Sequence, residues 1–420
     1  MTITKLAWKS LKNRKATAIL TILSITVSVA LLLGVERIRT EAKQGFTHTL
    51  SGTDLIIGAR SSPVNLLLYS VFHIGNATNN VSWKTYKELS NQPEVAWSIP
   101  LSLGDSHQGY RVVGTENQLF SHFKYANKQS LTFSDGKPFD DIYDAVIGCE
   151  VAEKLHYHVN QKIILSHGVQ GTRFQEHGDK PFTVSGILTC TNTPLDRVIL
   201  VSLEGIEALH LDWINGAPPL PSLSISAAKT HNMDLTPTSI TAWMVGLKSK
   251  IAVFQYQRKI NQYKPEALTA ILPGIVLQRL WVLVGSAENA LLAISIMVFL
   301  AGLIGMLTTI LASLNERRRE MAILRSIGAR PRHIFLLMIY ESIIYAMAGI
   351  LFGFMLVYGL LAGLKPLLES KLSLHISLTW PGHFELILAG FVLLSSVLFG
   401  IIPAWRAYKT SLSDGLAIKL

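Results

Sequence analysis

Histidine is the residue type in this sequence with the clearest capacity for chemistry, and most of the histidines lie in one segment. Ten of the thirteen fall between residues 36 and 286. His156 and His158 are alternate residues, so they would share a face of a strand and could share a metal ion, whereas on a helix they would not. His167 and His177 flank a Gly-rich turn. Because no CxxC pair and no HExxH motif accompanies them, we expect surface or loop histidines and no bound metal.

The residue patterns that usually carry catalysis are absent from the sequence. It contains no GxxxxGK[ST] phosphate-binding loop and no GxSxG nucleophile elbow. Asp140, Asp141 and Asp144 form an acidic cluster, but their spacing does not match the calcium loop D-x-[DN]-x-[DN]-G, which favours a solvated loop. We therefore expect a non-catalytic chain without a cofactor of its own.

Both cysteines, Cys149 and Cys190, lie in the same histidine-containing segment. If this segment faces the compartment outside a bacterial inner membrane, it meets an oxidising environment in which a disulfide can form. The alternative is two separate buried thiols that pack as small apolar side chains. The sequence leaves both alternatives open.

Four long apolar runs indicate the helices that would hold the chain in a membrane. Of the 420 residues, 16% are charged, against roughly 25% in an ordinary soluble domain. A spanning helix needs about 20 mostly apolar residues, and such runs occur at 16–35, 290–314, 334–363 and 384–402. Glu36 and Arg37 follow the first run in place of a small-residue cleavage site, so we expect an uncleaved membrane helix and not a signal peptide.

The formal net charge of +10 is distributed in a way that predicts orientation. Segments 1–15, 315–333 and 403–420 hold 14 basic and 3 acidic residues, whereas the rest of the chain holds 24 basic and 25 acidic residues. Because cytoplasmic loops carry an excess of Lys and Arg, these segments and both termini are predicted to be cytoplasmic. The charge then reports orientation in the bacterial inner membrane and leaves no basic surface for nucleic acid.

The predicted architecture is an α-helical membrane protein with one helix, a large external domain and three further helices. Its expected parts are an amphipathic elbow (1–15), helix one (16–35), a periplasmic domain (36–286), helix two (287–314), a cytoplasmic loop (315–333), helix three (334–363), a short periplasmic loop (364–383), helix four (384–402) and a cytoplasmic tail (403–420).

The external domain is predicted to be an α+β domain. Strand-like runs at 53–59, 95–103, 110–115, 162–168, 182–188 and 197–203 alternate with amphipathic helical segments at 83–90 and 150–156. We expect a subdomain inserted at roughly 118–225.

The segment NERRREMAILRSIGARPRHI, residues 315–334, is the sharpest motif in the sequence. The second apolar run continues into it without a breaker, Gly328 suits a helix C-terminus, and Pro331 suits the first turn of the next helix. Met321, Leu324 and Ile327 recur at three-residue spacing and would form an apolar face that needs a protein groove. The simpler alternative is that the basic residues only anchor the loop on the cytoplasmic side of the membrane. The apolar stripe instead favours a helix that docks to another protein.

This segment resembles the loop after the second helix in FtsX/MacB-type (type VII) ABC transporter permeases. Three further segments resemble parts of the same family. LAWKSLKNRKATAILTILSITVSVALLLG is similar to the elbow and first helix, and PAWRAYKTSLSDGLA is similar to the exit segment after helix four. AVIGCEVAEKLHYHVNQKIIL, with FTVSGIL and TNTPLDRVILVSL, is similar to the periplasmic core.

The resemblance implies a permease subunit that acts as a homodimer with separate ATPase subunits, which bind ATP and Mg. It implies that closure of the ATPases moves the coupling helix and that the second helix transmits this movement to the periplasmic domain. The coupling residues would be Arg317, Glu320, Met321, Leu324, Arg325, Ile327 and Gly328. A periplasmic or lipoprotein partner and the cargo stay open.

Two alternatives and two departures accompany this resemblance. The chain could be a receptor or scaffold without ATP coupling, with a metal- or haem-related ligand, or a proton-driven carrier, although four helices fit the inverted repeats of such carriers poorly. Asn160 and Gln161 stand where the family pattern suggests a Gly-containing turn. The ATPase fused in some MacB proteins is missing from this sequence, so we expect a separate one.

Glu341 is an acid inside the third apolar run, where a carboxylate is costly and usually faces protein or water. It could be a proton or substrate site or a structural hydrogen-bonding group. The resemblance favours a structural or coupling role, because an acid at the corresponding place is common in the family, whose members are not proton-coupled. Gly349 and Gly353 have the spacing of close helix–helix contacts, including contacts across a dimer.

Overall fold

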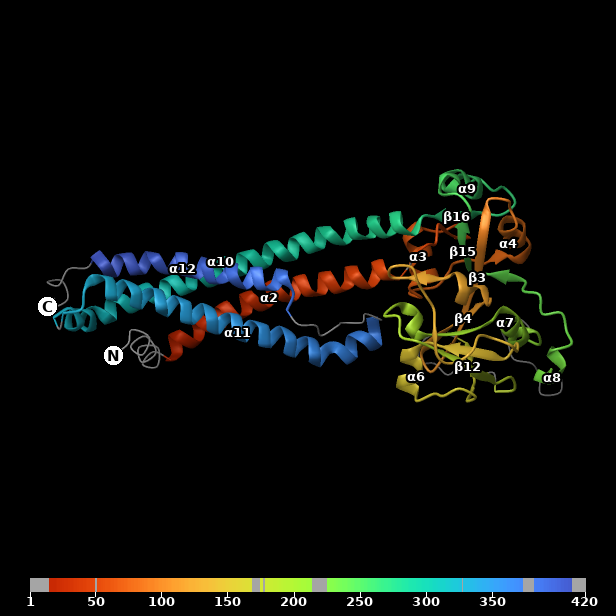
Figure 1. Ribbon diagram of the computed structural model, residues 1–420, viewed down its shortest axis with the longest axis horizontal. Coiled ribbons are helices and arrows are strands. Elements are labelled where there is room, and N and C mark those ends of the chain that lie inside the picture. The colour runs from red at the N-terminus through yellow and green to blue at the C-terminus, as the bar shows by residue number, and fades with distance from the viewer. Residues whose placement is uncertain are drawn as a thin grey trace. The chain divides into compact units, whose positions relative to one another are not determined.

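The computed structural model (Figure 1) describes residues 15–49, 51–167, 174–176, 178–213, 225–326, 328–372 and 381–409. The chain divides into two compact units. Met1–Ala42 and Val284–Leu420 form one of them, here called the helical unit, and Lys43–Leu283 form the other, here called the α/β unit. Residues 1–14 of the predicted elbow and residues 410–420 of the predicted tail lie outside the described part of the chain.

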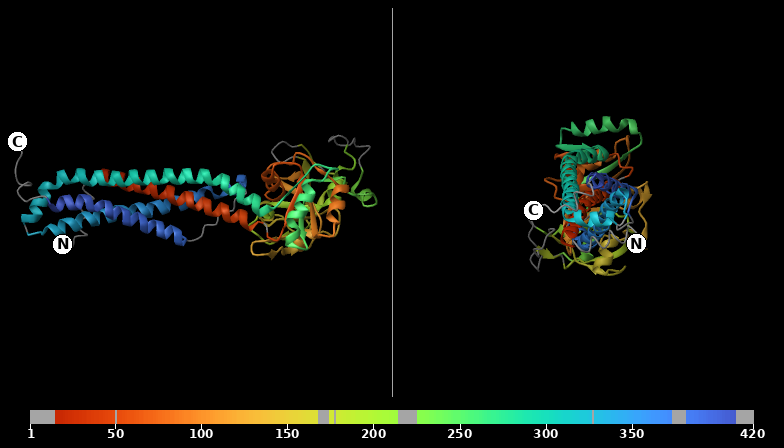
Figure 2. Two further views of the ribbon diagram at one scale, coloured as in Figure 1. Left: turned by 90° about the horizontal axis from the view of Figure 1, so that it is seen from above. Right: turned by 90° about the vertical axis from the view of Figure 1, so that its left-hand side faces the viewer.

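The long helices of the described residues are α2 (Lys15–His48), α10 (Pro273–Ser326), α11 (Pro331–Leu372) and α12 (His383–Lys409), and Figure 2 shows them side by side. Each contains a stretch that is long and apolar enough to cross a membrane, over Lys15–Arg37, Pro273–Ala312, Pro331–Leu364 and His383–Lys409. The four predicted apolar helices are therefore confirmed. At 1.5 Å per residue, α10 is about 80 Å long, well beyond the bilayer core of about 30 Å.

An apolar core holds the helical unit together. Val29 of α2, Met306 of α10, Met338 of α11 and Val392 of α12 are all fully buried in one cluster. Many other apolar side chains of these helices point outward, and Met297 is 70% exposed. An outward apolar surface of this kind is what a lipid-facing helix requires.

Gly349 and Gly353 of α11 pack against α2 of the same chain. A Cβ added at Gly349 would collide with Ile25, and one added at Gly353 would lie 2.6 Å from a methyl carbon of Val29. Their small-residue spacing therefore serves a contact within the chain, and the expected contact across a dimer is not needed to explain it.

The α/β unit is built on one mixed sheet. Its main path has the order β16-β1-β15-β3-β4-β13-β8-β12-β7, with parallel pairing of β13 with β4 and of β12 with β8, and antiparallel pairing elsewhere. These strands are β16 (Leu268–Ile271), β1 (Leu55–Ala59), β15 (Ala242–Leu247), β3 (Val95–His107), β4 (Tyr110–Thr115), β13 (Val198–Ser202), β8 (Asp144–Ile147), β12 (Phe182–Leu188) and β7 (Phe133–Gly136).

Short strands and helices complete this unit. The strands are β2 (Val81–Ser82), β5 (Lys124–Tyr125), β6 (Gln129–Ser130), β9 (Lys162–Ile163), β10 (Ser166–His167), β11 (Phe174–Glu176) and β14 (Ser239–Ile240). The helices are α3 (Pro63–Val71), α4 (Trp83–Ser90), α5 (Gln118–His122), α6 (Cys149–Leu155), α7 (Leu203–His210), α8 (Ala227–Thr230) and α9 (Val253–Asn261), with 3₁₀ turns η1 (Pro194–Arg197) and η2 (Lys250–Ala252). The predicted helices at 83–90 and 150–156 are confirmed, and the predicted strands at 110–115 and 182–188 are confirmed with the same bounds.

The long strand β3 joins the two halves of the sheet. It pairs with β15 over Val95–Leu101 and with β4 over Ser102–His107. All residues of β1, β13 and β15 are buried, because apolar clusters cover both faces of the sheet. The inserted subdomain at roughly 118–225 stays a prediction.

Candidate functional site

The predicted ATPase-coupling segment lies at the end of α10 and in the turn that connects α10 to α11. α10 continues beyond its apolar stretch to Ser326, and α11 begins at Pro331. Gly328 has φ +100°, a left-handed conformation that favours glycine and that often ends a helix. At the start of α11, the backbone N–H of Arg330 donates to His333 Nδ1 at 3.1 Å. The turn therefore lies between the end of α10 at Ser326 and the start of α11 at Pro331.

The structure describes only part of the set of predicted coupling residues. Arg317, Glu320, Met321, Leu324 and Arg325 have α-helical backbone in the last turns of α10. Their side chains lie outside the part of the chain that the structure describes, and so does all of Ile327. Gly328 is exposed, and a Cβ built on it would meet nothing within 4 Å, so its positive φ is the reason for glycine at this position. Docking to an ATPase stays a prediction.

Glu341 is buried in α11, with 3% of the residue exposed. The Tyr345 hydroxyl, one turn further along the helix, donates to Glu341 Oε1 at 3.4 Å. The neighbouring Ser342 is fully buried and donates its hydroxyl to the Met338 carbonyl at 3.1 Å. The structural role of Glu341 stays a prediction, and its hydrogen bond with Tyr345 is the contact on which a test can be built.

A second buried carboxylate, Glu385, was not singled out in the sequence analysis. Arg37 of α2 donates to Glu385 Oε1 of α12 at 3.3 Å, and their side chains are only 10% and 8% exposed. The Tyr358 hydroxyl of α11 donates to Glu385 Oε2 at 3.0 Å. The sequence signal was an acid at the start of one apolar run and an Arg at the end of another, which together suggest a buried pair.

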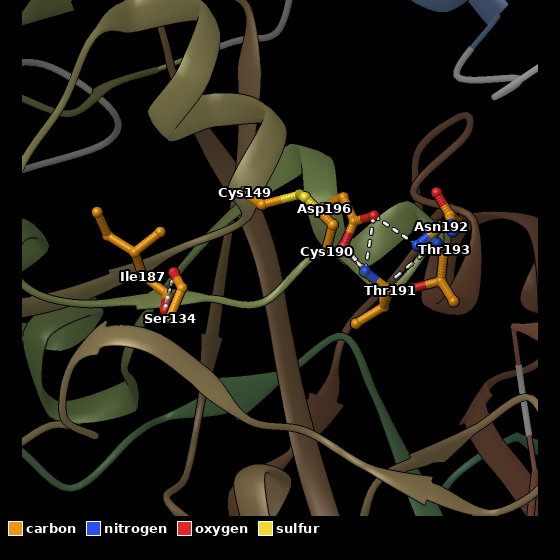
Figure 3. The surroundings of a disulfide bond; sticks show 8 residues. All are labelled: Ser134, Cys149, Ile187, Cys190, Thr191, Asn192, Thr193 and Asp196. Carbon is orange, nitrogen blue, oxygen red and sulfur yellow. Dashed lines mark hydrogen bonds between the residues drawn. A yellow bond between two sulfur atoms is a disulfide. The ribbon is translucent and has the colours of Figure 1, made fainter.

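Cys149 and Cys190 form a disulfide bond, which is the first of the two alternatives (Figure 3). It links the first residue of α6 to the turn after β12, with the two Cα atoms 5.2 Å apart. Beside it, the carboxylate of Asp196 accepts backbone hydrogen bonds from Thr191 at 2.8 Å and from Asn192 at 2.6 Å. Burial raises the pKa of Asp196, and these donors partly offset that effect.

The described histidines do not gather into a metal site. His156 ends α6 with φ +56°, and both it and His158 are exposed. His107 is buried, with Nδ1 2.6 Å from the Ile164 carbonyl oxygen and Nε2 2.8 Å from the Tyr157 hydroxyl. Within the described residues, no group of three or more His, Cys, Asp or Glu side chains could hold a metal ion. His177 and the side chain of His167 lie outside the described part.

The acidic cluster organises its own loop. Asp144 Oδ2 accepts the backbone N–H groups of Asp140 at 2.8 Å and Asp141 at 2.9 Å. Asp141 lies 2.9 Å from His231 Nε2 and accepts the N–H of Tyr143. Although burial raises the pKa of Asp141, these two partners outweigh it and hold the pKa below its usual value. The cluster therefore has a structural role in an exposed loop.

Asn160 provides the turn where the family pattern suggested a glycine. Its φ is +71°, in the left-handed region that Asn tolerates better than most residues. Its backbone N–H donates to the Val184 carbonyl of β12 at 2.8 Å. Asn160 can therefore form the turn in place of the glycine that the family pattern suggests.

The α/β unit also contains a buried ion pair that the sequence does not predict. Lys180 is fully buried, and its Nζ lies 2.6 Å from Asp212 Oδ1. The other carboxylate oxygen accepts the Ile225 N–H at 2.9 Å. Burial raises the pKa of Asp212, but Lys180 and this N–H outweigh burial and lower it overall. Asp212, which follows α7, thus holds the segments around Lys180 and Ile225.

Comparison with known proteins gives matches along most of the chain. The family model described as MacB-like periplasmic core domain matches residues 18–263, and the one described as FtsX-like permease C-terminal matches residues 292–412. The macrolide export ATP-binding/permease protein MacB of Wolinella succinogenes is 24% identical over 425 residues, which cover 96% of this chain and 59% of that protein.

Two further relatives have the same kind of name. The pyoverdine export ATP-binding/permease protein PvdT of Pseudomonas syringae pv. tomato is 22% identical over 345 residues, which cover 76% of this chain and 46% of the relative. MacB of Bdellovibrio bacteriovorus is 36% identical over 117 residues, which cover 28% of this chain and 17% of the relative. The chain thus aligns with part of each relative. Because the MacB-like core model alone covers more than half of it, the chain belongs to the FtsX/MacB-type ABC transporter permease family.

Proposed function

We propose that this chain is the membrane subunit that converts ATP hydrolysis by a separate ATPase subunit into movement of the α/β unit. In this proposal, the α10–α11 turn is the docking point for the ATPase. The observation that supports it most is the continuity of α10, which runs unbroken from Pro273 to Ser326. A single helix can transmit a displacement along its whole length because every backbone hydrogen bond is internal.

We propose the orientation that the charges indicate. The termini and the α10–α11 turn face the cytoplasm, and the α/β unit lies in the periplasm between the first membrane helix and the other three. Two copies of the chain assemble with two ATPases, which bind ATP and Mg. The purpose of the movement is export or extraction of a periplasmic or membrane cargo, and a periplasmic or lipoprotein partner could take part.

The names of the relatives indicate which cargo to test first. MacB and PvdT are named for the export of macrolides and pyoverdine. We therefore propose export of a comparable small molecule as the first cargo class. The receptor or scaffold alternative predicts that no ATPase accompanies the chain, and family membership does not favour it.

Co-purification of the ATPase tests this proposal. Leu324→Asp together with Ile327→Asp places two charges on the predicted docking stripe, so we expect loss of the ATPase from the complex after gentle detergent extraction. Ile251→Asp makes the same type of change at a residue of the α/β unit that is 89% exposed, and it should leave the ATPase bound. Equal recovery of the ATPase with both variants would contradict docking at this turn.

A further inference from the structure

Three helices of the helical unit meet at one buried charge cluster. Arg37 Nη1 of α2 lies 3.3 Å from Glu385 Oε1 of α12. Glu385 Oε2 accepts the Tyr358 hydroxyl of α11 at 3.0 Å and the N–H of Gly382 at 3.1 Å. The Arg37 guanidinium also lies 5.8 Å from the centre of the Tyr358 ring. Arg37, Tyr358 and Glu385 are here called the outer lock.

The physical chemistry of the outer lock resists separation of these helices. A buried charge is tolerated when it is paired and its remaining hydrogen-bonding capacity is filled, and losing one partner leaves the other uncompensated. Both oxygens of Glu385 are engaged, and its place in the first turn of α12 is favoured by the helix dipole. Moving α12 away from α2 and α11 would break both the Arg37–Glu385 ion pair and the Tyr358–Glu385 hydrogen bond.

The contact of α10 with the same part of α2 is of a weaker kind. Arg39 Nε lies 3.1 Å from Glu288 Oε2, but the Arg39 side chain is 45% exposed and that of Glu288 is 21% exposed. Arg39 also has a second acidic neighbour, Glu36, at 3.3 Å. Exposed ion pairs contribute little because water replaces the lost partner. This ion pair by itself therefore holds α10 to α2 only weakly.

Close packing also joins the helices further along their length. Gly349 and Gly353 fit α11 tightly against α2, and Gly400 of α12 leaves no room for a Cβ beside Ser342 of α11. α10 has its own close approach at Gly302, where a Cβ would lie 3.0 Å from Ser28 Oγ of α2. The Ser28 hydroxyl also donates to the Val298 carbonyl at 3.2 Å. This contact joins α10 to α2 at a level away from the outer lock.

We propose that the outer lock holds α2, α11 and α12 as a fixed frame, against which α10 moves about its contact at Gly302. This inference rests on the proposed function, because it assigns the ATP-driven movement to α10. Arg37, Tyr358 and Glu385 are thus positioning residues that keep the other helices in place while α10 transmits force.

The first test measures the lock without any ATPase. In the purified full chain, Arg37→Met and Glu385→Met should each lower the unfolding temperature by several degrees, and the double variant should lose clearly less than the two losses together. Arg39→Met and Glu288→Met are the matched pair and should give small, additive losses. If one of these variants does not fold, Tyr358→Phe is used instead. It removes only the hydroxyl that donates to Glu385 and should give a smaller decrease in unfolding temperature. Additive losses at Arg37 and Glu385 would overturn the lock.

The second test measures which helix moves. The two natural cysteines are joined to each other, so introduced cysteines can be linked selectively with a short bifunctional methanethiosulfonate reagent. In liposomes containing the chain and its co-purified ATPase, linking Arg37→Cys to Glu385→Cys should leave the ATP hydrolysis rate nearly unchanged. Linking Arg39→Cys to Glu288→Cys should lower that rate about tenfold. The corresponding single-cysteine variants, treated identically, are the controls.

The outcomes separate the inference from the proposed function. Inhibition by the Arg37–Glu385 link, or full activity with the Arg39–Glu288 link, would overturn the fixed frame even if the ATPase binds. If no ATPase accompanies the chain, the proposed function and the assignment of movement to α10 both fail. The unfolding measurements would still decide whether the lock exists.

Discussion

Cys149 and Cys190 close a loop within the α/β unit, with a sequence separation of 41 residues. A cross-link over a loop of this length stabilises the folded chain by about 4 kcal/mol in the chain-entropy account, because it restricts the unfolded state. We expect the double variant Cys149→Ser/Cys190→Ser to unfold at a distinctly lower temperature than the wild type under non-reducing conditions. With reductant present, the two proteins should converge; a persistent difference would indicate that the serines themselves disturb the fold.

His231 and Asp141 form an exposed pair whose stability depends on pH. The hydrogen bond to Asp141 raises the pKa of His231 above its ordinary value near 6.5. The pair therefore stabilises the fold fully below pH 6.5, and the contribution disappears as the pH rises through the higher folded-state pKa. We expect His231→Gln to lower the unfolding temperature at pH 5.5 but not at pH 9. A difference that did not change with pH would contradict the assignment.

Glu341 allows the two roles considered for an intramembrane acid to be separated. If it is a structural hydrogen-bonding group that accepts from Tyr345, Glu341→Gln should preserve both folding and the ATP hydrolysis rate of the complex. Glu341→Ala should destabilise the chain, because it leaves a cavity and removes an acceptor of the Tyr345 hydroxyl. Loss of transport with the Gln variant, at unchanged unfolding temperature, would instead favour a proton or substrate site.

At the scale of the elements, the contact between α2 and α11 depends on two glycines. Gly349→Leu or Gly353→Leu should lower the unfolding temperature strongly, since the side chain would overlap Ile25 or Val29 of α2. Gly359→Leu on the same helix is the matched control, because a Cβ at that position would meet nothing within 4 Å. Equal losses at all three positions would mean that the effect reflects helix content rather than packing.

The elements that the sequence predicted best are those with local signals. Gly328 and Pro331 bracket the α10–α11 turn because backbone conformation at these residues is decided within a few positions. Arg37 and Glu385 were not paired in advance, since they are 348 positions apart and only the folded bundle brings them together. Strand β3 was likewise predicted only to residue 103, because its second half contains Gly104, Asp105 and Ser106, which are poor strand formers on their own.

At the scale of the whole molecule, the composition and the family agree. The apolar helices and the MacB-like core identify a multi-pass protein of the inner membrane, with an α/β domain of the periplasmic type. The whole positive charge excess lies in the three segments predicted to be cytoplasmic. This distribution is what the positive-inside rule predicts for cytoplasmic segments, so the net charge alone gives no argument for a nucleic-acid partner.

The orientation of the molecule can be tested by labelling with a thiol reagent that does not cross membranes. Lys259→Cys in α9 and Arg330→Cys in the α10–α11 turn are both exposed positions, and the natural cysteines are protected as a disulfide. We expect the cysteine at 259 to react in intact spheroplasts, and the one at 330 to react only after the membrane is permeabilised. The reason is the energetic preference of Lys- and Arg-rich loops for the cytoplasmic side. Labelling of position 330 in intact spheroplasts would reverse the proposed topology and exclude docking of a cytoplasmic ATPase at this turn.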